Sequence, residues 1–326
     1  MKDLPAYISD RGHGEICYEV PLSISGATVY AFALHARHEA LQALVDSQLN
    51  AAASPTVHYE AVGHSVLLIY FHAEHSTSTT ETIGWLPDRE SMVWVLVVQK
   101  TAQGSRLMFW IPYLLIDAMS GMVTGREVWG YRKSLATIDL PIAATDPAQF
   151  VARTVVFKTF SPDTQGLVEP LITVSRNGPL GPLQTAWRDP EDVVKGAIAM
   201  LRESFSEFDM SDWLNAATVI EGLGKIAATL RIPVINLKQF RDVGDSAKAC
   251  YQALVESPCE LVTLHGAGPL PGDFTASFVT CDSHRVVADL GLGTPAPGAT
   301  SVPVRFAFWW KMDFKTLDGS VVWQAS

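Results

Sequence analysis

Apolar and polar positions alternate weakly through the first half of the chain, in runs rich in β-branched and aromatic residues. Such runs, separated by polar or turn residues, are typical of half-buried β-strands. The predicted strands span residues 27–34, 66–71, 91–98, 106–116, 152–157 and 171–174. A short helix is predicted over residues 37–44, because Leu41 and Leu44 have helical spacing. The first half is therefore expected to be β-rich and mainly antiparallel.

After Arg188 the pattern becomes helical. Asp189-Pro190-Glu191-Asp192 is typical of a helix start, because proline suits the first turn and acidic side chains suit the helix dipole. Apolar residues follow at helical spacing at Val194, Ala197, Ile198, Leu201 and Phe205. A second helix is predicted over residues 212–230, although Gly222 and Gly224 each cost about 1 kcal/mol relative to alanine. Further strands are predicted at residues 234–240, 251–255, 260–264, 274–281 and 306–312.

Composition narrows the class of protein. A chain of 326 residues, 48% hydrophobic and 18% charged, can bury a substantial core. Its formal net charge of -10 and the lack of a basic stripe argue against a nucleic-acid partner. The apolar runs are shorter than the about 20 residues of a membrane-spanning helix, and the polar start does not resemble a secretory leader. We therefore expect a cytoplasmic protein with no membrane partner.

Neither a metal site nor a cofactor site is predicted. The four cysteines are scattered without a Cys-x-x-Cys pair, which favours free thiols. In His72-Ala73-Glu74-His75, a strand would place His75 on the opposite face from His72 and Glu74. Gly266-Ala267-Gly268 lacks the rest of a dinucleotide-binding fingerprint.

The candidate chemistry centres on Lys133, which lies in the run from Gly125 to Ala136 among apolar and aromatic neighbours. An amine is nucleophilic only when deprotonated, and burial lowers a lysine pKa because it removes the water that favours the ammonium form. The neutral amine can then form a Schiff base with a carbonyl. We therefore expect desolvation to lower the pKa of Lys133. A surface lysine at a strand end, with a pKa of about 10.4, is the alternative.

The run Gly125-Arg126-Glu127, followed after a spacer by Tyr131-Arg132-Lys133-Ser134-Leu135, resembles the lysine motif of the acetoacetate decarboxylase superfamily. Further blocks resemble the family in order: residues 38–45 its early helix, Asp117 an acid ahead of the motif, and residues 236–238 and 283–289 its closing strands. The resemblance implies one domain over residues 1–326, an α+β, β-rich fold built on a cone-like antiparallel β-barrel. The lysine would lie in an interior pocket, and residues 189–230 would be a helical insertion.

The sequence departs from the family pattern at positions that take part in the family's chemistry. The family's Schiff-base lysine matches Lys133, but its second lysine falls on Ser134 and its proline on Arg132. The glutamate that precedes the family's central strand matches Glu90. By an ungapped reading, the arginine near the substrate carboxylate falls at Ala27, and another acidic partner falls on Ile69 or Tyr70. Strict acetoacetate decarboxylation is therefore in doubt.

The resemblance implies a cofactor-independent lyase in which Lys133 is the electron sink. Glu90 would position substrate or move protons, with a surface ion pair to Arg89 as the alternative. Tyr131, Arg132 and Ser134 are candidate substrate-binding residues, and the alternative for Tyr131 is an aromatic core residue whose hydroxyl is bonded to the backbone. The expected substrate is a keto acid or related small carbonyl compound, cleaved as in a decarboxylase.

Two other functions remain open at this stage: an aldolase-dehydratase acting on a pyruvate-like substrate, and a non-catalytic small-molecule binding protein. A near-neutral pKa of Lys133 would favour catalysis, and an ordinary one would favour binding. A homo-oligomer is also expected.

Overall fold

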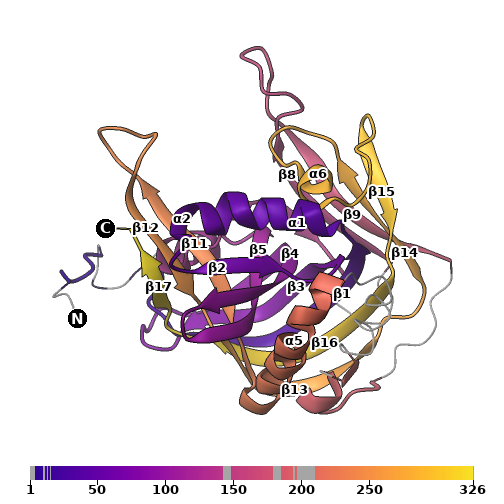
Figure 1. The fold of residues 1–326 in the computed structure, drawn as a ribbon, viewed down its shortest axis with the longest axis horizontal. Coiled ribbons are helices and arrows are strands. Elements are labelled where there is room, and N and C mark those ends of the chain that lie inside the picture. The colour runs from indigo at the N-terminus through magenta and orange to yellow at the C-terminus, as the bar shows by residue number, and fades with distance from the viewer. Residues whose placement is uncertain are drawn as a thin grey trace.

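A computed structural model describes residues 4–9, 12, 14, 16–141, 148–178, 185–193, 195–196 and 210–325. Within these ranges the chain forms two sheets and few helices, which confirms the expected β-rich α+β class (Figure 1). The larger sheet contains β1 (Leu22–His35), β2 (His58–Ala61), β3 (Ser65–Ser78), β4 (Leu86–Thr101), β5 (Gly104–Ile116), β6 (Lys133–Leu135), β10 (Arg231–Ile232), β11 (Val234–Arg241), β12 (Ala249–Glu256), β13 (Cys259–Pro269), β16 (Phe306–Thr316) and β17 (Ser320–Gln324). The smaller sheet contains β7 (Thr137–Asp139), β8 (Gln149–Val156), β9 (Leu167–Asn177), β14 (Asp273–Val279) and β15 (Ala299–Pro303).

The strand order of the larger sheet is β10-β13-β16-β1-β3-β4-β5-β11-β12-β17, with β2 beside β4 and β6 beside β5. Its ladders are antiparallel, as predicted, except that β6 and β11 each pair with β5 in parallel. This order is open. Among the described residues no ladder joins β10 to β17, so the cone-like barrel stays a prediction, as does the single domain over residues 1–326.

The helical segments are short except for one. They are α1 (His38–Val45), η1 (Asp46–Asn50), α2 (Ala51–Ala53), α3 (Met119–Thr124), η2 (Gly125–Trp129), α5 (Met210–Thr229) and α6 (Val286–Leu290), where η denotes π-helical turns. The prediction of an early helix is confirmed by α1. The expectation of a closing strand over residues 283–289 is wrong, because α6 occupies residues 286–290 and packs Val286, Val287 and Leu290 into the core.

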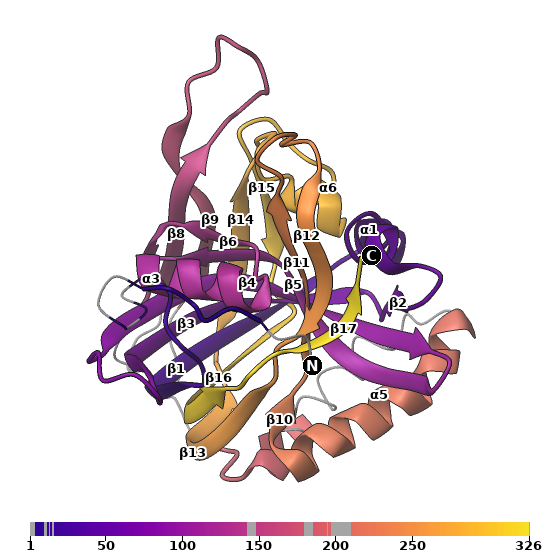
Figure 2. The same cartoon turned by 90° about the vertical axis from the view of Figure 1, so that its left-hand side faces the viewer.

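The predicted helical insertion is described in part. Residues 190–193 are helical, and the backbone N–H of Asp192 donates to Asp189 Oδ1 at 2.8 Å, as expected for a helix start. The predicted apolar positions at Val194, Ala197, Ile198, Leu201 and Phe205 lie outside the described residues. The second predicted helix is confirmed as α5, which runs beside β5 and β10 (Figure 2). No helix in the described part of the chain is long and apolar enough to cross a membrane.

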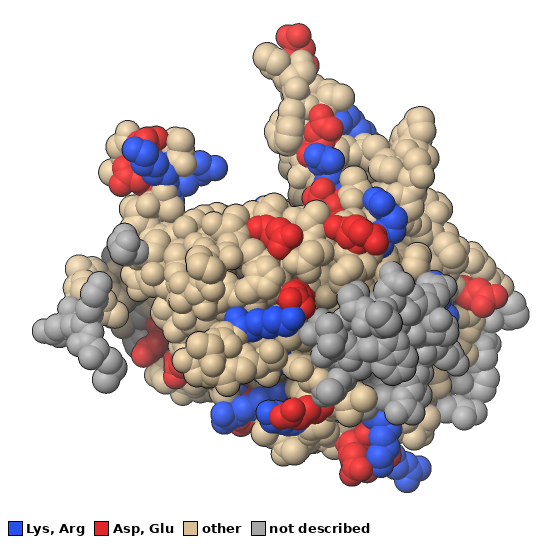
Figure 3. Space-filling view, viewed as in Figure 1, with Lys and Arg blue, Asp and Glu red and all other residues tan. Residues whose placement is uncertain are grey.

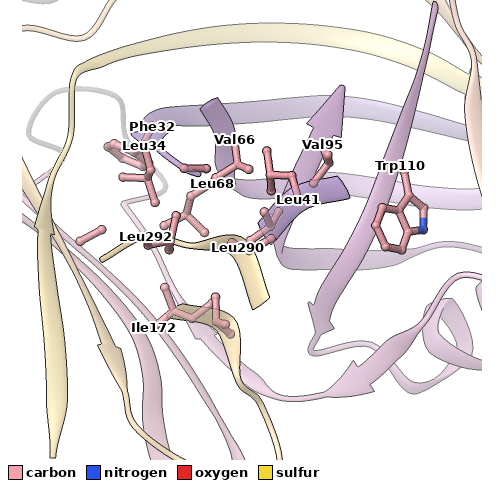
Figure 4. Packing of buried hydrophobic residues seen from close by; sticks show 14 of the residues in the cluster. Phe32, Leu34, Leu41, Val66, Leu68, Val95, Trp110, Ile172, Leu290 and Leu292 are labelled. Carbon is pink, nitrogen blue, oxygen red and sulfur yellow. The ribbon is translucent and has the colours of Figure 1, made fainter. Parts of the chain in front are cut away.

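The larger sheet is buried on both faces. Alternate residues of each strand point to opposite sides, and each side carries its own apolar cluster. On one face Phe32, Leu34 and Leu68 meet α1 through Leu41 and α6 through Leu290 (Figure 4). Aromatic side chains from both sheets join this core, where Phe32 and Phe150 meet edge to face with centroids 5.0 Å apart. The opposite face carries a second apolar cluster, from which the candidate site is built.

Acidic and basic side chains are interspersed on the molecular face shown in Figure 3. Two hairpins, β8–β9 and β11–β12, project from the body of the protein (Figure 1).

Candidate functional site

The second face of the larger sheet lines a partly open cavity of about 300 Å³. Its walls are mainly apolar and aromatic side chains from strands far apart in the sequence, such as Ile69, Met92, Phe109, Phe308 and Trp310. A cavity of this size lies at the lower end of the range for small-molecule sites, about 300 to 1,000 Å³.

Strand β4 brings two carboxyl groups into this apolar lining. Asp88, Glu90 and Met92 occupy alternate positions of the strand and therefore share its cavity face. Arg89, between the two acids, faces the other side, where its Nη1 donates to the carbonyl of Ile138 at 3.4 Å and its Nε lies 4.0 Å from Asp117 Oδ2. The alternative ion pair between Glu90 and Arg89 is therefore not formed.

Strand β6 places Lys133 opposite these acids. Lys133 pairs in register with Leu114 of β5, while Glu90 pairs with Ile116 of the same strand. The chain reaches this position from η2 through Gly130, whose φ of 80° is a left-handed conformation that suits glycine. The lysine stem then runs so close to Gly125 that an added Cβ there would lie 2.6 Å from Lys133 Cε.

Lys133 and Glu90 form a mostly buried ion pair. Lys133 Nζ donates to Glu90 Oε1 at 2.6 Å, and each side chain is only 11% exposed. Burial lowers the pKa of Lys133, but the carboxylates of Glu90 and Asp88 raise it by more, so its pKa lies above the ordinary lysine value. The expectation that desolvation alone would set this pKa is therefore wrong, because two acids share the lysine's cavity.

Asp88 is a buried polar group of the site without a full set of partners, as are Trp94 and Thr316 of the same lining. Its Oδ1 is buried and has no hydrogen-bond partner. Burial, together with the negative charge of Glu90, raises the pKa of Asp88 to about 8. At neutral pH the resting cavity therefore holds one ammonium, one carboxylate and one neutral carboxylic acid.

Tyr131 lies at the edge of the same group. Lys133 Nζ lies 5.7 Å from the centroid of its ring, within cation–π range. Its hydroxyl accepts a hydrogen bond from Ser257 Oγ at 2.8 Å, and Asn236 Nδ2 in turn donates to Ser257 Oγ at 3.0 Å. The Tyr131 hydroxyl is thus anchored to the protein.

Burial raises the pKa of the neighbouring Cys259 thiol to about 12, so this thiol is protonated at neutral pH.

The structure does not bring Arg132 and Ser134 into the cavity. The side chain of Arg132 points away, and its Nη1 donates to Gln48 Oε1 at 2.6 Å. Ser134 follows Lys133 on β6 and so faces the other side of the strand. Of the predicted site residues, the structure brings together Lys133, Glu90 and Tyr131.

Sequence reasoning missed three contributors to the cavity. Asp88 had a weak signal: it lies two residues before Glu90, just ahead of the predicted strand over residues 91–98, and an extension of that strand places both acids on one face. Cys259 had none, since it reaches the cavity from β13. The contribution of α5 through Leu223 and Ile226 depends on how that helix packs on the sheet.

Comparisons with known proteins find similarity to acetoacetate decarboxylases. A model of the acetoacetate decarboxylase (ADC) family matches residues 3–158. Comparison with curated protein sequences finds no match.

Solved structures extend the likeness over nearly the whole chain. The acetoacetate decarboxylase of Legionella pneumophila subsp. pneumophila (strain Philadelphia 1) has a TM-score of 0.58 at 14% identity, covering 99% of this chain and 92% of its own. A structure from a study of acetoacetate decarboxylase has a TM-score of 0.56 at 13% identity, covering 95% and 92%. The enduracididine biosynthesis enzyme MppR, complexed with pyruvate, has a TM-score of 0.52 at 13% identity, covering 96% and 94%.

The fold and site define a β-rich α+β protein with a lysine and two acids in an apolar interior cavity. The resemblance to the acetoacetate decarboxylase superfamily that the sequence predicts is confirmed by the family model over residues 3–158, and the solved structures show the same fold over nearly the whole chain.

Proposed function

We propose that the protein is an enzyme that forms a Schiff base between Lys133 and a carbonyl substrate and cleaves or forms a carbon–carbon bond beside that carbonyl. The observation that carries the proposal is the buried pair of Lys133 Nζ and Glu90 Oε1, 2.6 Å apart inside an apolar cavity. The match of residues 3–158 to the acetoacetate decarboxylase family supports an enzyme of this kind. The proposed reaction uses no cofactor.

In this mechanism Glu90 is the proton acceptor for Lys133. Transfer of one proton along their hydrogen bond turns the ion pair into a neutral amine and a carboxylic acid. The amine attacks the carbonyl carbon, and loss of one water gives an iminium on Lys133. Asp88, protonated at neutral pH, is placed to supply the proton that the departing oxygen needs.

The iminium then acts as the electron sink. The electron pair of the breaking carbon–carbon bond moves into it and forms an enamine, which takes up a proton at carbon. Addition of water releases the product and restores the amine. Decarboxylation of a keto acid follows these steps, with carbon dioxide as the fragment that leaves. In aldol-dehydration chemistry on a pyruvate-like substrate, the iminium instead loses a proton from its adjacent carbon to the Asp88 carboxylate left by the previous step, and the resulting enamine adds to an aldehyde before water is lost. The pyruvate complex of MppR supports the second.

One observation favours a second candidate, a non-catalytic small-molecule binding protein. The raised pKa of Lys133 keeps its amine charged in the resting state, as in an ionic anchor. Burial alone would have produced a neutral amine.

Reductive trapping separates the two candidates. The protein is incubated with acetone, pyruvate or acetoacetate and sodium cyanoborohydride, and the modified lysine is located by peptide mass mapping. We expect an adduct on Lys133 that is lost in Lys133→Ala and retained in Lys238→Ala, a control at a half-buried lysine outside the cavity lining. Modification spread evenly over surface lysines, with none on Lys133, would reject the Schiff-base proposal.

Homo-oligomer formation and a cytoplasmic location remain predictions. Size-exclusion chromatography with light scattering tests the first.

A further inference from the structure

The cavity is long as well as apolar. Lys133 lies beside Leu114 of β5, and the same cavity is lined by Phe109, five residues farther along that strand. At about 3.4 Å per residue, the lining therefore extends up to roughly 17 Å along β5. At the far end, Leu223 of α5 both lines the cavity and packs on Leu107.

The charge of the cavity is concentrated at the other end. Among the described residues of the lining, only Asp88, Glu90 and Lys133 carry ionisable acid or base side chains that charge near neutral pH. The lining contains no described arginine, and the single ammonium is already paired with Glu90. Ala27, the position at which the family's arginine falls in the sequence, is fully buried in the second apolar cluster.

This arrangement disfavours a carboxylate ligand. A carboxylate that enters the cavity loses its water and meets Glu90, and the described lining residues offer no unpaired cation to replace that water. A neutral carbonyl compound has no such cost. Its oxygen also suits Asp88, which is protonated at neutral pH and whose buried Oδ1 has no partner in the protein.

We infer that the substrate is a neutral ketone or aldehyde with a long apolar substituent, whose carbonyl group meets Lys133 and Asp88 and whose apolar chain runs along β5 toward α5. This inference rests on the proposed Schiff-base function and specifies its substrate class. Iminium formation from such a substrate releases one water and needs no other reactant. A small acid such as pyruvate would leave most of the apolar cavity unfilled.

A chain-length series tests the inference. Acetone and methyl propyl, pentyl, heptyl and nonyl ketones are compared as trapping partners for Lys133, with cyanoborohydride and peptide mass mapping. The concentration for half-maximal modification should fall by up to about fourfold for each methylene that the cavity buries. A long-chain α-keto acid with the same nonyl group is the matched charged compound, and it should require at least about tenfold more than methyl nonyl ketone.

Two substitutions on α5 locate the apolar end. Leu223→Trp narrows the cavity and should weaken trapping by methyl nonyl ketone more than trapping by acetone. Ile226→Trp is the second variant at this end, in case Leu223→Trp does not fold. Ile220→Trp is the control, because Ile220 is 58% exposed on the same helix and lies outside the lining. It should leave the whole series unchanged.

The outcomes separate the inference from the proposed function. If pyruvate or the long-chain keto acid traps Lys133 as well as methyl nonyl ketone does, the substrate class is wrong while the Schiff-base function stands. If no carbonyl compound modifies Lys133, the Schiff-base function fails. Quenching of tryptophan fluorescence by methyl nonyl ketone then tests the inferred ligand class. Saturable quenching would support a binding protein for neutral long-chain carbonyl compounds, and no quenching would overturn this ligand class.

Discussion

Replacing Glu90 by glutamine tests whether a carboxylate holds the charge of the candidate nucleophile. Lys133 Nζ and Glu90 Oε1 are 2.6 Å apart, and both side chains are 11% exposed. At an effective dielectric constant of about 20, two unit charges at this distance attract by about 6 kcal/mol. This corresponds to about four to five units of lysine pKa, at 1.36 kcal/mol per unit.

Asp88 will offset part of this loss. Its pKa is raised to about 8 by burial and by the charge of Glu90, so removal of that charge makes Asp88 easier to ionise beside Lys133. In Glu90→Gln we therefore expect the pKa of Lys133 to fall by about 1 to 3 units. In the double variant with Asp88→Asn, burial acts without either acid, and a fall of about 3 to 5 units is expected.

The assay is the pH dependence of reductive alkylation of Lys133 by acetone, followed by peptide mass mapping. Only the neutral amine reacts, so the midpoint of the rate profile reports the pKa of Lys133. Glu60→Gln is the matched control, because Glu60 pairs with Lys100 at the surface and not with the cavity. Identical midpoints in the wild type and in both cavity variants would refute the ion-pair account.

Two further variants probe the surroundings of the pair. Gly125→Ala should reduce trapping of Lys133 at least about tenfold with little change in melting temperature. The new Cβ would lie 2.6 Å from Lys133 Cε, and the flexible lysine side chain can move away from it without a shift of the backbone. Peptide mass mapping measures the trapping, and calorimetry measures the melting temperature. Asp88 is faced by Glu90, Lys133 and Asp117, and its raised pKa means that the folded state holds its proton more tightly than the unfolded state. Wild-type stability should therefore fall by up to about 1.4 kcal/mol per pH unit between about pH 4 and 8, and urea titrations should show a flatter profile in Asp88→Asn, whereas parallel profiles would contradict the assignment.

Much of the fold could be predicted from hydrophobic periodicity. The predicted strand over residues 91–98 is the centre of β4, and the predicted helix over residues 212–230 is α5. The strand ends were missed, because β3 and β4 continue into polar residues whose backbone is paired to neighbouring strands. Periodicity reports which side chains are buried, and a paired but half-exposed strand end leaves only a weak signal in it.

The site was less accessible to sequence reasoning. The motif identified Lys133, and the resemblance identified Glu90, but the pairing of the two depends on β6 lying parallel to β5 and β5 antiparallel to β4. Neither register can be derived from local pattern. The pKa of Lys133 was predicted in the wrong direction for the same reason, since the count of nearby carboxylates is a tertiary property.

A raised lysine pKa and a nucleophilic role are compatible if the ligand changes the surroundings of the pair. In the resting cavity the ion pair of Lys133 and Glu90 is stabilised by the residual solvent that reaches both side chains, each 11% exposed. An apolar chain that fills the cavity excludes this water and lowers the local dielectric constant, which raises the cost of two separate charges. Transfer of the proton from Lys133 to Glu90 then relieves that cost and frees the amine. A neutral apolar substrate would thereby generate the nucleophile that attacks it, whereas a carboxylate would hold the ammonium in its charged form.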